Sequence, residues 1–197
     1  GSAVPGMPGY VFDEVCGFQS SIPTDGLIVF YPFNGNSDDE SGNVNHGTVH
    51  SAILTTDRFG TQDRAYSFDG SAYIRKDQFN LVVSDFTVSR WMYADNVPPW
   101  YRQPFAIHSG GGGINFGDKA ITMHYTNNGS NLDAYYFTSD GASLGDGVRF
   151  SPLTPGSWFH VVYLREGNDQ RLYVDGGFVD VYTDGFGSFQ IQNGLLD

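Results

Sequence analysis

The feature that most limits the fold is a period of two in the placement of large apolar side chains. From Phe86 to Tyr93 and from Trp158 to Arg165, successive residues fall into two alternating sets, as on the two faces of a β-strand. Between Leu172 and Val181, Asp175-Gly176 separates two apolar stretches, and this dipeptide favours a tight hairpin because both turn positions require positive φ. No window keeps a helical period for more than about two turns. The sequence therefore predicts strands.

The rest of the chain also resembles a series of short strands separated by turns. Its 197 residues include 26 Gly and are 16% aromatic, a composition that favours turns and strands over helices. Strands at such short spacing, without helices to serve as crossovers, predict one all-β domain in which two antiparallel sheets pack as a β-sandwich. The further strands expected are Leu27–Phe33, His46–Ile53, Ala65–Phe68, Tyr73–Arg75, Pro104–Ser109, Ala120–Tyr125, Asp133–Thr138, Arg171–Val174 and Phe178–Tyr182.

The first 25 residues differ from the rest. Prolines and glycines scattered through them leave no room for a long element, so residues 1–25 are interpreted as a leader or linker and residues 26–197 as the domain. Gly1-Ser2 has the appearance of a cloning scar. Cys16 is the only cysteine, so no disulfide can form within the sequence.

The charge of the chain argues against two classes of partner. The net charge is −12, from 10 Lys plus Arg against 22 Asp plus Glu. The phosphate backbone of nucleic acid and an anionic membrane surface would both repel such a protein. No apolar run reaches the roughly 18 residues that a membrane span needs, so no membrane insertion is expected.

A loop rich in oxygen follows the first expected strand. Between Asn34 and Asn45 the side chains are mostly Asn, Asp, Glu and Ser, and Gly35 and Gly42 let the backbone fold back. Calcium takes six to eight oxygen ligands at roughly 2.3–2.6 Å, and such a loop can supply several of them. The same residues also form ordinary turns by bonding their own backbone. Composition alone leaves both interpretations open.

Eight short motifs occur in an order typical of one family. They are Gly26-Leu-Ile-Val-Phe-Tyr-Pro-Phe-Asn-Gly-Asn, Asp39-Glu-Ser-Gly-Asn, His46-Gly-Thr-Val, Asp57-Arg-Phe-Gly, Tyr66-Ser-Phe-Asp-Gly, Asp85-Phe-Thr-Val-Ser-Arg-Trp, Trp158-Phe-His-Val-Val and Leu172-Tyr-Val-Asp-Gly. The chain from about residue 25 onward thereby resembles the laminin-G-like, concanavalin A-like jelly-roll domains of secreted bacterial enzymes and adhesins. The resemblance implies two curved antiparallel sheets, a ligand on the concave sheet, calcium on the rim, and a secreted or cell-surface location.

The resemblance also implies particular calcium ligands. They are Asn34, Asp39, a carbonyl of the turn containing Asp69 and Gly70, and Asp197 in Asn193-Gly-Leu-Leu-Asp. Members of the family continue past the Gly-Leu-Leu-Asp position into a closing strand. We therefore expect the fold to be completed either by the leader around Tyr10–Phe18 or by a strand that this sequence lacks.

Catalysis is not expected, although the family includes glucanases and lyases. A retaining glucanase needs two carboxylates about 5–5.5 Å apart, which this family delivers from alternate positions of one strand. The three glutamates, Glu14, Glu40 and Glu166, lie in the leader and in turns, so no such strand exists. The lyase pattern requires Gln-x-His, and Gln190-Ile191-Gln192 lacks the histidine.

Two groups of residues have the chemistry of a sugar-binding site. Flat aromatic faces stack on the apolar faces of sugars, and amides and guanidinium groups bond their hydroxyls. The predicted ligand-binding residues are Trp100, Tyr101 and Arg102, which follow two prolines, and Asn127, Asn128 and Tyr135. We expect a non-catalytic carbohydrate-binding module whose partner is a polysaccharide or other glycan. A protein-binding adhesion module is the alternative, and a polysaccharide hydrolase or lyase is the third, disfavoured one.

Overall fold

The regular secondary structure in the described part of the chain is β-strand. The computed structural model describes residues 10–12, 18–20, 22–96, 102–109, 119–126, 131–137, 147–185 and 189–197, without the side chains of 10–12, 18–20, 135–137 and 189. These residues form no helix, so none is long and apolar enough to cross a membrane. The strands are β1 (Tyr10–Phe12), β2 (Phe18–Ser20), β3 (Thr48–His50), β4 (Ile53–Thr55), β5 (Ala65–Ser67), β6 (Tyr73–Val83), β7 (Phe86–Tyr93), β8 (Arg102–His108), β9 (Ala120–Tyr125), β10 (Leu132–Phe137), β11 (Gly147–Phe150), β12 (Trp158–Glu166), β13 (Asp169–Val174), β14 (Gly177–Thr183) and β15 (Phe189–Leu196).

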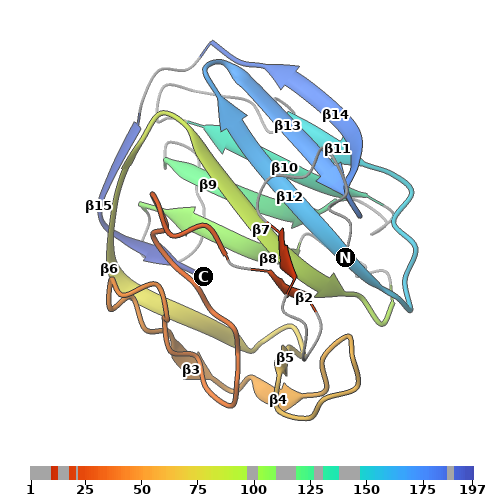
Figure 1. Cartoon of the computed structure of the whole chain (residues 1–197). Coiled ribbons are helices and arrows are strands. Elements are labelled where there is room, and N and C mark those ends of the chain that lie inside the picture. The colour runs from red at the N-terminus through yellow and green to blue at the C-terminus, as the bar shows by residue number, and fades with distance from the viewer. Residues whose placement is uncertain are drawn as a thin grey trace.

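Two antiparallel sheets face each other and form a β-sandwich. The larger has seven strands in the order β11-β10-β9-β8-β15-β6-β3, and the smaller has four in the order β14-β13-β12-β7. In Figure 1 the four-stranded sheet is layered over β8, β9 and β10 of the other. The predicted all-β, two-sheet antiparallel fold is therefore confirmed.

The hydrophobic core lies between these two sheets. It combines Phe79, Ile121 and Leu132 of the seven-stranded sheet with Val161 and Tyr163 of the four-stranded sheet, all with relative exposures of 2% or less. Because successive side chains of a strand point to opposite faces, the residues between these core positions point away from the sandwich. Each sheet therefore has an outer face of its own.

The strands with the clearest period of two are confirmed. In β12, buried Phe159, Val161 and Tyr163 alternate with partly exposed neighbours, and β7 has the bounds expected for it. The predicted hairpin is also present. Asp175 and Gly176 have φ of 49° and 78° and connect β13 to β14.

Several strand predictions are wrong. The segment Leu27–Phe33 is not a strand, although Val29 and Tyr31 pack against the core. The stretch His46–Ile53 is interrupted at Ser51, whose φ is 59°, so it contributes only β3 and the first residue of β4. A backbone with positive φ leaves the extended conformation that a strand requires.

The end of the sequence also differs from the prediction. Asn193-Gly-Leu-Leu belongs to β15, which pairs with β6 on one side and β8 on the other. Asp197 continues this pairing by exchanging backbone hydrogen bonds of 2.9 and 2.8 Å with Ala106. In the leader, β1 and β2 pair with each other as a separate two-stranded sheet, so they do not extend either main sheet.

Candidate functional site

Polar side chains gather on the outer face of the seven-stranded sheet. Met123, Tyr125 and Leu132 belong to the core, so His124 and Asp133, which lie between core positions on β9 and β10, point to the outer face. His124 is paired with Asp133 across the two strands. Both are buried, with relative exposures of 8% and 1%. Since buried polar groups are costly unless they are bonded, their partners decide what this face can do.

The first cluster on this face is a row that crosses four strands. Asp133 on β10 is paired with Arg149 on β11, whose Nε and Nη2 donate to the two carboxylate oxygens at 2.7 and 2.8 Å. On the other side of Asp133 lies His124, and Nε2 of Gln103 on β8 is 3.4 Å from Nε2 of that ring. The Arg149 side chain is 54% exposed, whereas that of Asp133 is 1% exposed, so a solvent-exposed guanidinium is bonded to a buried carboxylate. We call Arg149, Asp133, His124 and Gln103 the polar row.

The imidazole of the polar row is neutral. Burial lowers the pKa of His124 to about 4, and the nearby negative charge of Asp133 opposes this effect only in part. The contact with Gln103 agrees, because an amide nitrogen can only donate and the ring nitrogen facing it must accept. At neutral pH the row therefore presents a guanidinium, an amide and an uncharged imidazole.

A second cluster lies where β15 ends. Asp197 accepts hydrogen bonds from Nε and Nη2 of Arg75 at 2.6 and 3.0 Å, and its Oδ2 lies 3.2 Å from Nε2 of His108. Burial raises the pKa of Asp197, but the hydrogen bonds from His108 and Arg75 outweigh it and hold that pKa below its usual value. Asp197 is therefore a paired carboxylate that fixes the end of β15 to β6 and β8.

The carboxylates of Asp133 and Asp197 are not arranged as a glycosidase pair. Asp133 on β10 and Asp197 just after β15 are separated by β9 and β8, so three inter-strand spacings put them about 14 Å apart. Glycosidases of either stereochemical type hold their carboxyl groups within about 10 Å. Each of these aspartates is also neutralised by its own arginine. The face offers hydrogen-bond donors and acceptors more readily than an acid and a base.

The predicted ligand-binding residues are placed only in part. Arg102 begins β8, is paired with Tyr125 at the end of β9, and donates from Nη1 to the carbonyl of Gly70 at 2.9 Å. Tyr135 lies in β10 opposite Thr122, and its side chain is not described. Trp100, Tyr101, Asn127 and Asn128 lie outside the described residues. The binding roles of all six residues stay predictions.

The first two predicted calcium ligands take part in hydrogen bonds within their own loop. Asn34 donates from Nδ2 to Oε1 of Glu40 at 2.6 Å. The carboxylate of Asp39 accepts from the backbone N–H groups of Phe30, Ser41 and Asn45 at 2.9 Å, and also from the Ser41 hydroxyl. Burial raises the pKa of Asp39, and these bonds more than reverse the effect, so its pKa is lowered. Asp39 thus fixes the loop to the segment containing Phe30.

The other predicted calcium ligands are bonded separately. Asp69 accepts from the backbone and hydroxyl of Ser71 at 2.8 Å, while the carbonyl of Gly70 accepts from Arg102. Within the described residues, no three His, Cys, Asp or Glu side chains form a group that could hold a metal ion. The predicted set differs from such a group, because it combines the Asn34 amide and a main-chain carbonyl with the carboxylates of Asp39 and Asp197. Calcium binding itself stays a prediction.

Sequence reasoning did not identify the polar row. Asp133 was named only as the first residue of an expected strand, and β11, which contains its partner Arg149, was not predicted. Apolar neighbours surround His124, so the alternation of β9 is hidden in the sequence. The available signal was the adjacency of the expected strands 120–125 and 133–138, which a short connection would pair as antiparallel neighbours.

Comparison with known proteins bears on the fold. Residues 68–195, more than half of the chain, match the family described as the Concanavalin A-like lectin/glucanases superfamily. No curated protein matches the sequence. Domain 4 of a GH43 extracellular arabinanase from Geobacillus stearothermophilus, solved with arabinotriose, aligns with a TM-score of 0.54 and 18% identity, over 84% of this chain and 79% of that one.

A sialidase mutant from Trypanosoma rangeli aligns with a TM-score of 0.55 and 14% identity. The alignment covers 91% of this chain but only 31% of the sialidase chain. At such identities these likenesses describe the fold alone. They agree with the two-sheet sandwich seen in Figure 1.

Proposed function

This chain belongs to the Concanavalin A-like lectin/glucanases superfamily, and from that premise we propose that it is a non-catalytic carbohydrate-binding module of a secreted or cell-surface protein. The observation that carries the proposal is the polar row, in which Arg149, Asp133, His124 and Gln103 follow one another across four neighbouring strands. Adjacent strands are about 4.8 Å apart, so the row is long enough to bond several hydroxyl groups of one glycan.

The proposed glycan is neutral. Arg149 bonds both oxygens of Asp133 and Arg75 bonds both oxygens of Asp197, so the two guanidinium groups already have anionic partners. The guanidinium of Arg149, the amide of Gln103 and the uncharged imidazole of His124 are all groups that form hydrogen bonds with sugar hydroxyls. A sulfate or uronate would also meet a protein whose net charge is −12.

The proposed stacking surface lies at one end of β8 and β9. Trp100 and Tyr101 immediately precede Arg102, and Asn127 and Asn128 follow closely on Tyr125, with which Arg102 is paired. We assign stacking to the two aromatic residues and hydrogen bonding to Arg102 and the two asparagines. Tyr135 on β10 would complete the site. Calcium stabilisation is a separate proposal that binding at this face does not require.

The proposal is tested by isothermal titration with neutral oligosaccharides, with arabinotriose as the first probe and a glycan array for breadth. Gln103→Ala removes one donor of the polar row, and Trp100→Ala removes a stacking surface. Each is expected to weaken binding roughly tenfold, the effect of one lost hydrogen bond or stacked ring. Thr87→Ala on the exposed face of β7 is the matched control and should bind as the wild type does.

Two results would contradict the proposal. One is the absence of binding to any neutral glycan on the array. The other is binding that Thr87→Ala weakens as much as Gln103→Ala does, because the ligand would then contact the other sheet. Hydrolysis of the bound oligosaccharide would overturn the non-catalytic assignment while leaving the location of the site intact.

A further inference from the structure

The chain contains three pairs of asparagine followed by glycine. They are Asn34-Gly35, Asn128-Gly129 and Asn193-Gly194. In such a pair the backbone nitrogen of the glycine can attack Cγ of the asparagine, because glycine has no side chain to obstruct the approach. The second pair lies outside the described residues. The first and the third have different surroundings, and these predict which of the two reacts.

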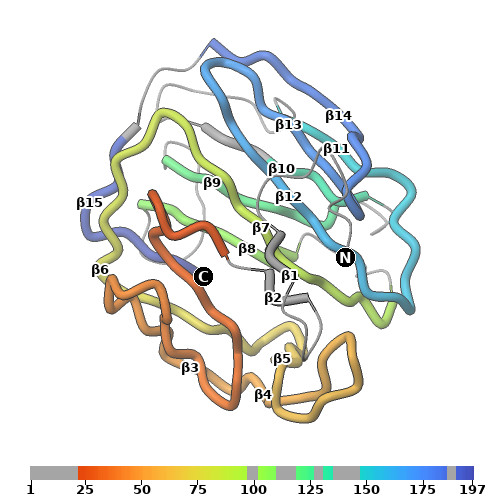
Figure 2. Tube along the Cα trace, viewed as in Figure 1, coloured from red at the N-terminus to blue at the C-terminus, as the bar shows by residue number. Residues whose placement is uncertain are grey.

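The first pair lies in an open loop. Asn34 and Gly35 follow the segment Leu27–Phe33, and both are exposed. Gly35 has a φ of 99°, and a Cβ built on it would meet nothing within 4 Å. Among the backbone hydrogen bonds of the described residues, none is donated by the N–H of Gly35. Figure 2 shows this loop as part of the red-to-orange tube at the periphery of the molecule. The nitrogen that must attack is therefore accessible.

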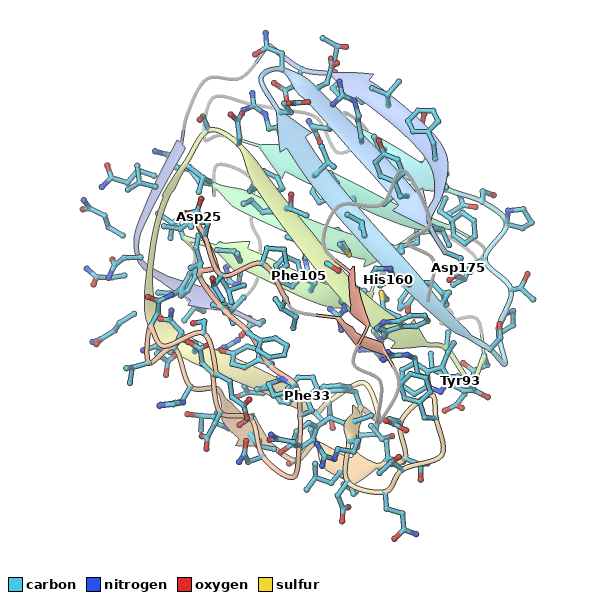
Figure 3. All side chains as sticks on the ribbon, in the orientation of Figure 1. Asp25, Phe33, Tyr93, Phe105, His160 and Asp175 are labelled. Atoms are coloured by element: carbon cyan, nitrogen blue, oxygen red, sulfur yellow. The ribbon has the colours of Figure 1, made fainter. Side chains whose placement is uncertain are left out.

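The residues beside Asn34 hold it in place without a strand ladder. The ring of Phe33, which Figure 3 labels, packs edge-on against Tyr66 with 5.1 Å between the ring centroids. Nδ2 of Asn34 donates to Oε1 of Glu40 at 2.6 Å. These contacts involve side chains, and neither Asn34 nor Gly35 belongs to a strand. The attack on Asn34 therefore requires no strand to leave its sheet.

The third pair is enclosed by its sheet. Gly194 is buried in β15 and is paired with Phe79 of β6. A Cβ built on Gly194 would lie 2.2 Å from Cγ2 of Ile191 and 2.6 Å from the carbonyl oxygen of His108, so its neighbours are close on that side. The nitrogen of Gly194 can attack Asn193 only after β15 opens locally. Such an opening costs free energy and slows the reaction in the folded protein.

We propose that Asn34 is a site of spontaneous deamidation in the folded protein. The nitrogen of Gly35 loses its proton and bonds to Cγ of Asn34, while the bond from Cγ to Nδ2 breaks and ammonia leaves with that proton. The product is a five-membered succinimide ring. Water then adds to one of the two ring carbonyl carbons, and the bond from that carbon to the ring nitrogen breaks. Breakage at Cγ gives aspartate, and breakage at the main-chain carbon gives isoaspartate. The reaction consumes one water, releases one ammonia and involves no oxidation or reduction.

Deamidation changes the contact with Glu40. The Asn34 amide donates a hydrogen bond to this glutamate, whereas an ionised carboxylate at the same position can only accept. Two ionised carboxylates in contact repel each other, so the contact between residues 34 and 40 is lost. Asp39 keeps its hydrogen bonds to the backbone of Phe30 and Ser41, so the change is confined to the tip of the loop. This inference is independent of glycan binding and of calcium.

The test follows both pairs in one sample of the whole protein. The folded protein is incubated at mildly alkaline pH, where the glycine nitrogen loses its proton more readily, and a matched sample is incubated in urea. Peptide mass spectrometry measures conversion at residues 34 and 193 and separates aspartate from isoaspartate by fragmentation. In the folded protein we expect Asn34 to convert roughly tenfold or more faster than Asn193. In urea the two should convert at similar rates, because the sheet no longer protects Asn193.

Variants assign the reaction to this site. In Asn34→Gln the acidic form that carries a converted residue 34 should be absent from anion-exchange profiles, because the longer side chain places its amide carbon out of reach of a five-membered ring. Asn168→Gln replaces an exposed asparagine that no glycine follows, so residue 34 should convert as fast as in the wild type. The comparison between residues 34 and 193 of the wild type does not depend on either variant. The proposal is overturned if residue 34 stays an asparagine in the folded protein, or if Asn193 converts there as fast as Asn34.

Discussion

The neutral imidazole of His124 predicts a specific dependence of stability on pH. Its pKa is about 4 in the folded protein, against 6.5 for an ordinary histidine in the unfolded chain. A lowered folded pKa means that the unfolded state binds the proton first as the pH falls. The stability contributed by the neutral ring is therefore complete above pH 6.5 and is lost as the pH falls from 6.5 to 4. The difference in pKa corresponds to about 3 kcal/mol of unfolding free energy.

The assay is urea unfolding of the wild type and of His124→Gln at a series of pH values between 7 and 4. His124→Gln retains a polar side chain that cannot titrate. Its loss of unfolding free energy between pH 7 and pH 4 should therefore be about 3 kcal/mol smaller than that of the wild type. His160 also has a pKa lowered by partial burial and by Arg58, so His160→Gln measures its separate share. Thr48→Ala, at an exposed position of β3, is the control and should follow the wild type.

The reasoning would be refuted if His124→Gln lost stability with falling pH as steeply as the wild type. A titration of the His124 ring by NMR gives an independent check. A midpoint near 6.5 in the folded protein would mean that the ring is solvated and takes up its proton at the same pH as in the unfolded chain. The polar row would then present a cation at mildly acid pH, and its preference for neutral glycans would need another basis.

Three further predictions concern stability. Asp184→Asn leaves Arg165 buried without the carboxylate that bonds its Nε and Nη2 at 2.8 Å. The loss should cost about 3–5 kcal/mol of unfolding free energy and lower the melting midpoint in calorimetry by roughly 10 °C. Glu166→Gln, at an exposed position, should not shift the midpoint. Gly194→Ala places a Cβ 2.2 Å from Cγ2 of Ile191 and 2.6 Å from the carbonyl oxygen of His108. Urea unfolding should therefore show a loss of about 1–3 kcal/mol in unfolding free energy. Gly185→Ala, whose Cβ meets open space, should show no such loss. If calcium binds the folded state, a melt with added Ca²⁺ should exceed one in EDTA by several degrees, and equal midpoints would remove Asn34, Asp39, Asp69, Gly70 and Asp197 from the list of ligands.

The sequence was informative where one face of a strand is apolar and the other polar. β7 alternates in this way, β12 is an apolar run in which every second residue is buried, and Asp175-Gly176 needs positive φ at both turn positions. Both strands and the hairpin were predicted correctly. The segment Leu27–Phe33 was wrongly predicted as a strand, because a continuous apolar run has no period that identifies its conformation. Its apolar residues do pack on the core, but the loop hydrogen bonds replace the ladder that a strand would have.

The candidate site depended on contacts between distant residues, which the sequence does not encode locally. Arg149 and Asp133 meet because β11 pairs with β10, and β11 was not predicted. Asp197 meets Arg75, 122 positions earlier, because β15 lies between β6 and β8. The predicted aromatic residues Trp100 and Tyr101 depended on local chemistry alone, and they stay predictions.

The central claim is that a neutral glycan binds the outer face of the seven-stranded sheet at the polar row. The most direct measurement is a titration of the isotope-labelled protein with a neutral oligosaccharide that binds on the array, followed through its backbone and side-chain amide NMR signals. Our account predicts that the shifts cluster on β8, β9, β10 and β11, including the side-chain amide of Gln103. Shifts confined to β12, β13 and β14, or no shifts at saturating ligand, would contradict it.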